Sequence, residues 1–128
     1  MIVNERVVSY INSLDRGNSD ICNIIEKEAI EDQVPIIRKE MGNLLKVLLK
    51  LKQPKSILEV GTAVGYSSIL MSENMPVDCK IVTIENYDKR IPIARNNIKR
   101  AGKEDCIQLI EGDAMEVLKE LEGPFDLS

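Results

Sequence analysis

The sequence contains no histidine and no tryptophan among its 128 residues. Without histidine, neither a Ser-His-Asp triad nor a Cys-His pair can form, so the two commonest nucleophile and base pairings are excluded. The cysteines, Cys22, Cys79 and Cys106, stand far apart with no Cys-x-x-Cys motif, which argues against a disulfide framework and a zinc site. We therefore expect reduced, mostly buried thiols, and chemistry that relies on carboxylates, lysines or a cofactor.

Aromatic residues are also scarce, at 3% of the chain. This argues against a surface that binds single-stranded nucleic acid by stacking bases on rings, but it leaves phosphate contacts with duplex or tRNA open. The net charge is −4, yet residues 38–55 and 89–103 carry six Lys or Arg each against a single acid, Glu40. Such stretches can form a phosphate-facing surface, or they can be the solvated faces of helices; their interleaving with apolar residues at helical spacing favours the second interpretation.

No apolar run approaches the ~20 residues that a membrane-spanning helix needs. The first 14 residues are interrupted by polar side chains such as Asn4 and Glu5, so they do not resemble a signal peptide. We expect a cytoplasmic protein without a membrane partner.

The pattern of apolar residues changes near Pro54. Before it, steps of three and four predict helices over residues 3–14, from Ser19 or Asp20 onward, and over 35–52. After it, short apolar runs predict strands that alternate with helices. The predicted strands are 56–60, 80–85 and 106–110, with a fourth beginning at 125–127, and the predicted helices are 66–74, 88–101 and 114–121. We divide the chain into a helical region, 1–54, and a cofactor-binding portion, 55–128.

Strands and helices that alternate with short connections imply a parallel sheet with right-handed crossovers. We expect the strand order 3-2-1, which is half of a doubly wound α/β sheet whose carboxyl half is missing. Ligands bind such sheets at the carboxyl ends of the strands. Here those positions are residues 61–67, Glu85 and residues 112–114, so three loops should converge on one crevice.

The first of these loops has the spacing Gly-x-x-x-Gly, from Gly61 to Gly65. It lacks both the Gly-x-Gly-x-x-Gly fingerprint and the phosphate-loop motif, so a nucleoside without phosphates fits better than a pyrophosphate. A nicotinamide-dependent oxidoreductase would need glycine where Ala63 stands. Glu85 lies 24 residues after Gly61, where an acidic side chain binds ribose hydroxyls in this topology, and Asp113 is placed to hold an adenine edge.

The segment 57–67, ILEVGTAVGYS, resembles the first motif of the class I S-adenosylmethionine-dependent O-methyltransferases of the catechol and caffeoyl-CoA type. Residues 81–85 resemble the ribose-binding strand of that family, 110–114 its adenine loop, and 38–51 its helix leading into the core. The resemblance covers nearly the whole chain. Within the family, the chain is most similar to bacterial enzymes that methylate 5-hydroxyuridine in tRNA.

The resemblance implies a role for nine residues. The methionine end of S-adenosylmethionine would lie near Gly61, Thr62 and Ser67, with Glu59 beneath it. Glu85 would bind the ribose hydroxyls. The remaining predicted contacts are Asp113 and Ala114 at the adenine, Ile37 closing the pocket, and Tyr66 beside the glycine loop.

Each prediction has a structural alternative. Glu59 and Ser67 can be a charge at a strand end and a helix cap, and Glu85 can be a solvated strand end. Tyr66 can serve packing alone.

Family members continue past the Phe-Asp-Leu of residues 125–127 to an aspartate that binds a divalent metal, but this chain ends at Ser128. We therefore predict no catalytic and no metal-binding residues in the chain, and magnesium only in the intact protein. The predicted function is methyl transfer to a hydroxyl, either 5-hydroxyuridine of tRNA or a small catechol-like acceptor, with the 128-residue chain inactive by itself. The alternative is a noncatalytic module that binds a nucleoside or dimerises. Loss of the strands that would flank residues 57–60 predicts a homodimer.

Overall fold

The structure, a computed structural model, describes residues 5–6 and 17–121. The helix predicted over residues 3–14, apart from helical Glu5 and Arg6, and the strand predicted at 125–127 lie outside the described residues.

Strands and helices alternate after residue 55, as the sequence predicts. The three strands are parallel and adjacent in the order β1-β2-β3, which confirms the predicted 3-2-1 order and the α/β fold class. The elements are α2 (Asp20–Glu31), α3 (Lys39–Lys52), β1 (Ser56–Val60), α4 (Tyr66–Ser72), β2 (Lys80–Glu85), α5 (Ile91–Arg100), β3 (Ile107–Glu111) and α6 (Ala114–Glu120).

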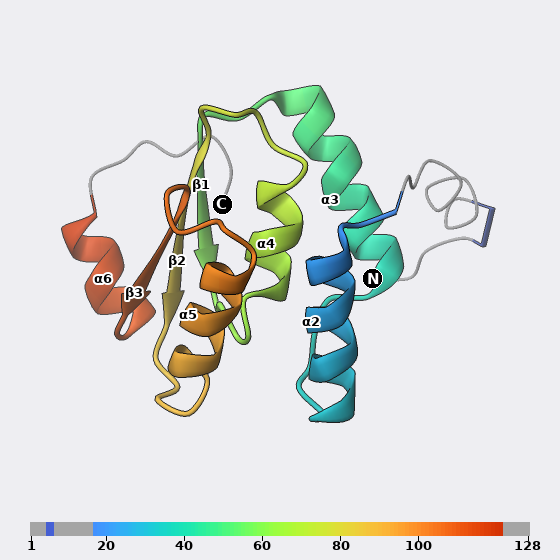
Figure 1. Cartoon of the computed structure of the whole chain (residues 1–128). Helices are drawn as coiled ribbons and strands as arrows, with labels where there is room; N and C mark the ends of the chain where they lie inside the picture. The colour runs from blue at the N-terminus through green and yellow to red at the C-terminus, as the bar shows by residue number, and fades with distance from the viewer. Residues whose placement is uncertain (1–4, 7–16, 122–128) are drawn as a thin grey trace.

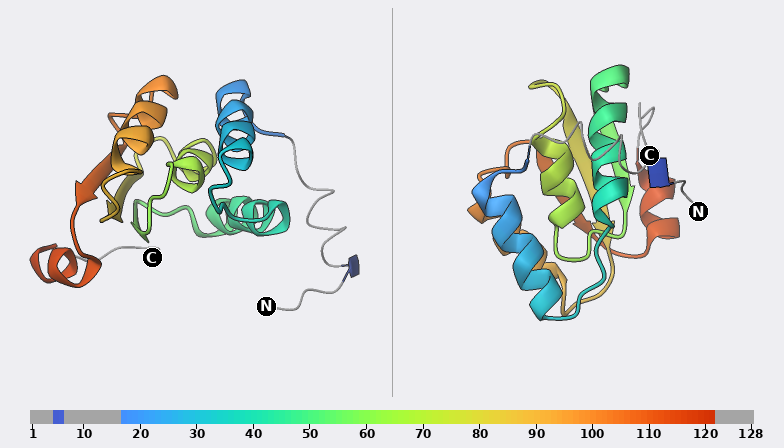
Figure 2. Two further views of the ribbon diagram at one scale, coloured as in Figure 1. Left: turned by 90° about the horizontal axis from the view of Figure 1, so that it is seen from below. Right: turned by 90° about the vertical axis from the view of Figure 1, so that its right-hand side faces the viewer.

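The helices lie on both sides of the sheet. Helices α4 and α5 cover one side and α6 lies on the other, while α2 and α3 both contact α4 (Figures 1 and 2). Because side chains alternate along a strand, Ile57, Ile81 and Ile107, which are paired across the strands, all lie on one face of the sheet. All three are buried in a core that also takes side chains from α2 and α3, so one apolar core spans both sides of Pro54.

Local signals in the sequence account for several element boundaries. Ser19 is the N-cap of α2, and its hydroxyl accepts a hydrogen bond from the Cys22 amide. Pro92 lies in the first turn of α5, where a missing N–H leaves no hydrogen bond unmade. Both placements confirm the prediction from sequence.

The segment before α3 differs from the prediction. The helix predicted from Pro35 begins only at Lys39; residues 34–38 have no regular secondary structure, and the backbone at Arg38 is extended. In this conformation Val34, Ile36 and Ile37 pack, partly buried, against the core. Burial of these apolar side chains thus outweighs the helical signal of Pro35.

The buried face of α3 differs from the one that apolar spacing predicts. Leu48 and Leu51 continue the apolar stripe at helical spacing, yet Leu51 is 77% exposed, and the buried positions are Gly42, Asn43, Lys46 and Leu49. Gly42 lies against Leu70 of α4, since a Cβ there would be 3.4 Å from Cδ2 of that side chain. The packing of α3 on α4 thus uses a face that includes Gly42 and leaves Leu51 outside.

The edge of the sheet at β1 carries an exposed apolar side chain, since Val60 is 58% exposed. The cysteines are free thiols, with Cys22 and Cys79 buried and Cys106 half-buried, as expected. Over residues 5–6 and 17–121, no helix is both long and apolar enough to cross a membrane.

Candidate cofactor site

The turn between β1 and α4 has a backbone that few residues can adopt. Gly61, Ala63 and Gly65 have φ values of 92°, 52° and 88°. Gly65 also lies against α5, because a Cβ at this position would be 3.5 Å from the backbone oxygen of Ala94. The positive φ at position 65 therefore favours glycine, while the neighbouring helix leaves room for ordinary contact.

Backbone hydrogen bonds hold the three loops together at the carboxyl end of β2. The amides of Gly61 and Thr62 donate to the Ile84 carbonyl, at 2.8 and 3.3 Å, and the Gly112 amide donates to the Glu85 carbonyl at 3.0 Å. The loops that follow β1 and β3 are thus both anchored on the last residues of β2. This confirms the predicted convergence of three strand ends.

Glu85 is the side chain at the centre of this convergence, and it is only 9% exposed. Its Oε1 accepts a hydrogen bond of 2.7 Å from the Ala63 amide, and its Oε2 accepts from the amides of Asn86 and Tyr87 at 3.1 and 3.0 Å. The carboxylate therefore joins the glycine loop to the loop after β2. A solvated strand end, the alternative weighed for Glu85, does not describe this position.

Glu59 collects hydroxyl donors beneath the glycine loop. Its carboxylate accepts from the hydroxyls of Ser67 and Ser68, and from that of Thr83 at 2.7 Å. The hydroxyls of Thr83 and Thr62 are 2.6 Å apart. A hydroxyl has one proton, and Thr83 donates it to Glu59, so Thr62 must be the donor to Thr83. Each hydrogen bond from Thr62 through Thr83 therefore points toward Glu59.

Ser67 is thus tied to Glu59 and does not act as a helix cap, because the N-cap of α4 is Gly65. Sequence reasoning did not select Ser68 or Thr83. The alternation of β2 places Thr83 on the same face as Glu85, which was the available signal.

A cavity of about 240 Å³ opens beside the loop. Its lining combines the glycine loop with the segment before α3, so Ile37 lies there as predicted. The lining residues are Pro35, Ile36, Ile37, Gly61, Thr62, Ala63, Val64, Tyr66 and Ser67. Sequence reasoning did not select Pro35 and Ile36, because it placed them in a helix, and it gave no individual role to Ala63 and Val64, whose apolar side chains suggest no polar contact.

The Val64 carbonyl on the other side of this loop accepts a hydrogen bond of 2.8 Å from the side chain of buried Asn97 on α5. The loop is therefore held by β2 through Glu85 and by α5 through Asn97.

Asp113 has a local role in the structure. It is the N-cap of α6, and its Oδ1 accepts from the amides of Met115 and Glu116 at 2.9 and 3.3 Å. Ala114 follows as the first residue of that helix. Gly112 brings both residues to the end of β2, but a contact with adenine stays a prediction.

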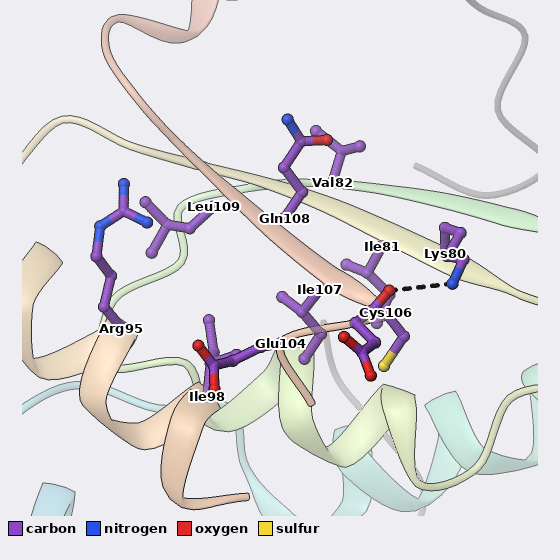
Figure 3. A pocket seen from close by; sticks show the side chains of 11 residues that line it. Lys80, Ile81, Val82, Arg95, Ile98, Glu104, Cys106, Ile107, Gln108 and Leu109 are labelled. Atoms are coloured by element: carbon purple, nitrogen blue, oxygen red, sulfur yellow. Dashed lines mark hydrogen bonds between the residues drawn. The ribbon is translucent and has the colours of Figure 1, made fainter. Parts of the chain in front are cut away.

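Two larger hollows lie elsewhere. One of about 430 Å³ runs along β3 and α5, where the ammonium group of Lys80 donates to the Asp105 carbonyl at 3.0 Å (Figure 3). The other, about 510 Å³, lies between α2 and α5. The hollow along β3 contains none of the residues 61–67 and neither Glu85 nor Asp113, and the other includes only Val64 from that set, so size alone does not identify the site. The smaller cavity is the candidate cofactor site because it adjoins the strand ends that bind ligands in this topology.

No group of three or more His, Cys, Asp or Glu side chains within the described part of the chain is placed to hold a metal ion. The described residues therefore do not fit the divalent metal that the resemblance implies for the intact protein.

Comparison with known proteins agrees with this architecture. Residues 18–127 match the family model described as O-methyltransferase. A catechol O-methyltransferase of Niastella koreensis is 34% identical over 96% of this chain and 58% of its own length. A second, from Mycobacterium tuberculosis, is 34% identical over 71% of this chain and 42% of its own length. The chain thus spans about half the length of these curated relatives.

Solved structures give the same result. A Podospora anserina methyltransferase, solved with S-adenosylhomocysteine bound, superposes with a TM-score of 0.84 at 30% identity, covering 99% of this chain and 58% of that one. An O-methyltransferase of Bacillus cereus, also in complex with S-adenosylhomocysteine, has a TM-score of 0.79 at 25% identity, covering 96% and 60%. On the family model and these relatives, the chain belongs to the O-methyltransferase family.

Proposed function

We propose that this chain binds S-adenosylmethionine at the carboxyl end of its sheet and forms the cofactor-binding portion of an enzyme that methylates a hydroxyl group. The observation that carries the proposal is the convergence of three loops on Glu85 beside the cavity at Gly61. Similar proteins solved with S-adenosylhomocysteine bound support the choice of cofactor.

The proposed contacts use side chains that already form one connected site. The methionine end would lie over Gly61, Thr62 and Ser67, with the carboxylate of Glu59 beneath it to balance the ammonium charge. When bound, the cofactor supplies a methyl group on a positively charged sulfur. The chain itself orients the cofactor and excludes water from one side, since Ile37 and Tyr66 line the cavity wall.

Glu85 would bind the ribose hydroxyls, but few of its hydrogen-bond acceptor positions are free. A carboxylate offers about four acceptor positions, and amides of the loops occupy three of them. Two ribose hydroxyls therefore require Glu85 to release or share at least one amide. Ala63 lines the cofactor cavity, so we expect its amide to be the one that moves. Asp113 and Ala114 would meet the adenine.

The acceptor is a hydroxyl of a small catechol-like molecule or of 5-hydroxyuridine in tRNA. The names of the curated relatives favour the catechol-like acceptor. The divalent metal that the resemblance implies, magnesium, would need ligands beyond the described residues, which provide no ligand group. The division of the chain at residue 54, a homodimer and a cytoplasmic location are further proposals from the sequence.

A second candidate is a noncatalytic module that keeps nucleoside binding. The observation in its favour is that the cofactor side of the site is built while no metal-ligand group is present among the described residues. Binding without turnover would distinguish this module from an enzyme.

Calorimetric titration of the 128-residue chain with S-adenosylhomocysteine tests the proposal. We expect one site per chain, with weak affinity because water competes for polar contacts in an open cavity. Absence of binding at millimolar ligand would contradict the proposal.

A further inference from the structure

Tyr66 links the glycine loop to a helix that is remote in the sequence. The side chain is 6% exposed, and its hydroxyl donates a hydrogen bond of 2.8 Å to Oε2 of Glu26, 40 residues earlier on α2. Tyr66 lines the cofactor cavity and immediately follows Gly65. The loop is therefore tied to α2 as well as to β2 and α5.

The same helix also sets the opposite wall of the cavity. At the end of α2 the chain turns sharply, with φ of 58° at Gln33 and a hydrogen bond of 2.9 Å from the Val34 amide to the Ala29 carbonyl. Residues 35–37 follow directly and line the cavity. Helix α2 is thus connected to both sides of the cavity. It leads directly into residues 35–37 along the backbone, and it contacts the glycine loop through the hydrogen bond between Glu26 and Tyr66.

We propose that Glu26 is a positioning residue that preforms the cofactor pocket by fixing Tyr66, and with it the glycine loop, relative to the wall at Ile37. This inference rests on the proposed function. Without the hydrogen bond, the wall and the loop can separate, and the cofactor must restore their spacing when it binds. Ordering a site during binding lowers affinity.

The electrostatic surroundings of Glu26 support this role. Burial raises the pKa of the Cys22 thiol to about 12, and the carboxylates of Glu73 and then Glu26 contribute to that rise. A hydrogen bond from the Tyr66 hydroxyl to a carboxylate at Glu26 is stronger than one between neutral partners.

The chain offers a matched control on the same helix. Glu28 lies two residues after Glu26 and pairs with Arg100 of α5 at 2.6 Å, away from the residues that line the cavity. Replacing Glu28 with glutamine removes the charge of this ion pair and so weakens a tie of α2 to α5, without touching Tyr66. The Glu28 variant therefore distinguishes a general weakening of α2 packing from the loss of the specific hydrogen bond between Glu26 and Tyr66.

The experiment compares Tyr66→Phe, Glu26→Ala, Glu26→Gln, the double variant Glu26→Ala/Tyr66→Phe and Glu28→Gln. S-adenosylhomocysteine affinity is measured by calorimetry, at a temperature where circular dichroism shows every variant folded. We expect Tyr66→Phe and Glu26→Ala each to weaken affinity about tenfold, which is the loss of one hydrogen bond to a charged group. The double variant should be no weaker than either single one. Glu26→Gln, whose amide oxygen still accepts a hydrogen bond, should recover part of the loss, and Glu28→Gln should bind like the parent.

Three results would overturn the inference while leaving the proposed function intact. They are parent-like affinity in Glu26→Ala, additive losses in the double variant, or a loss in Glu28→Gln as large as that in Glu26→Ala. A parent chain that binds no S-adenosylhomocysteine would instead refute the proposed function, and the inference with it.

Discussion

Replacement of Glu85 tests the centre of the proposed site. In Glu85→Ala the amides of Ala63, Asn86 and Tyr87 lose their acceptor. Asn86 and Tyr87 are exposed, so water can hydrate their amides, whereas the half-buried Ala63 amide is harder to hydrate. One such group costs about 1–3 kcal/mol. We expect Glu85→Ala to lower the free energy of unfolding by about 2 kcal/mol, and Glu85→Gln, which keeps one acceptor oxygen, by about half as much.

Glu85→Ala should also lower the affinity for the cofactor, by a free energy of similar size. Loss of charge-assisted hydrogen bonds to the ribose removes about 1.5–3 kcal/mol of binding free energy, or roughly tenfold to a hundredfold in Kd. Urea unfolding and calorimetric titration with S-adenosylhomocysteine measure the two quantities separately. The matched control is Glu111→Gln, because Glu111 is paired with Glu85 across the sheet and its side chain makes an exposed contact of 3.4 Å with Arg95. Parent-like affinity in Glu85→Ala would refute the ribose assignment.

Four further predictions concern the loop, a buried thiol, turnover and assembly. Gly65→Ala should cost about 1–2 kcal/mol in a urea melt, since an alanine at a φ of 88° is strained; an unchanged melt would contradict the loop geometry. The pKa of Cys22 is raised to about 12, so the unfolded chain loses its thiol proton first and stability should fall as pH rises above about 9, by about 1.4 kcal/mol per unit. Cys22→Ala should remove this slope, and an unchanged difference between the two proteins from pH 8 to 11 would refute it. The purified 128-residue chain should show no methyl transfer to catechols or tRNA with or without magnesium, and turnover by protein of verified mass would count against this. Light scattering at tens of micromolar should report a dimer or larger assembly that covers the β1 edge near Val60, and a stable monomer would disprove it.

The sheet could be predicted from sequence because each strand is a short apolar run next to a turn signal. Ile57, Ile81 and Ile107 repeat this pattern, and the short connections leave parallel pairing as the simple solution. The convergence of the loops followed from topology alone. Apolar runs and turn residues were therefore sufficient to predict the strands, because these signals lie within each strand and its flanking turns.

The α3 region could not be predicted because contacts between distant residues decide it. Nothing near Pro35 shows that residues 35–37 lie beside the glycine loop, and the apolar stripe with Leu51 concealed that Gly42 packs on Leu70. The same limit applies to the site. Glu26 and Asn97 hold Tyr66 and Val64 across 40 and 33 residues, and no spacing rule connects them.

The most direct test of the proposed cofactor site is an amide NMR titration of the ¹⁵N-labelled chain with S-adenosylhomocysteine. We expect saturable shifts at Gly61, Ala63, Asn86 and Gly112, the amides that tie the three loops together. The largest change should be at Ala63, because Glu85 must give up a hydrogen bond to accept the ribose hydroxyls. The amide signals of residues 104–109, which line the hollow of about 430 Å³ along β3, should not shift. Shifts confined to residues 104–109, or no shifts at all, would contradict the proposed site.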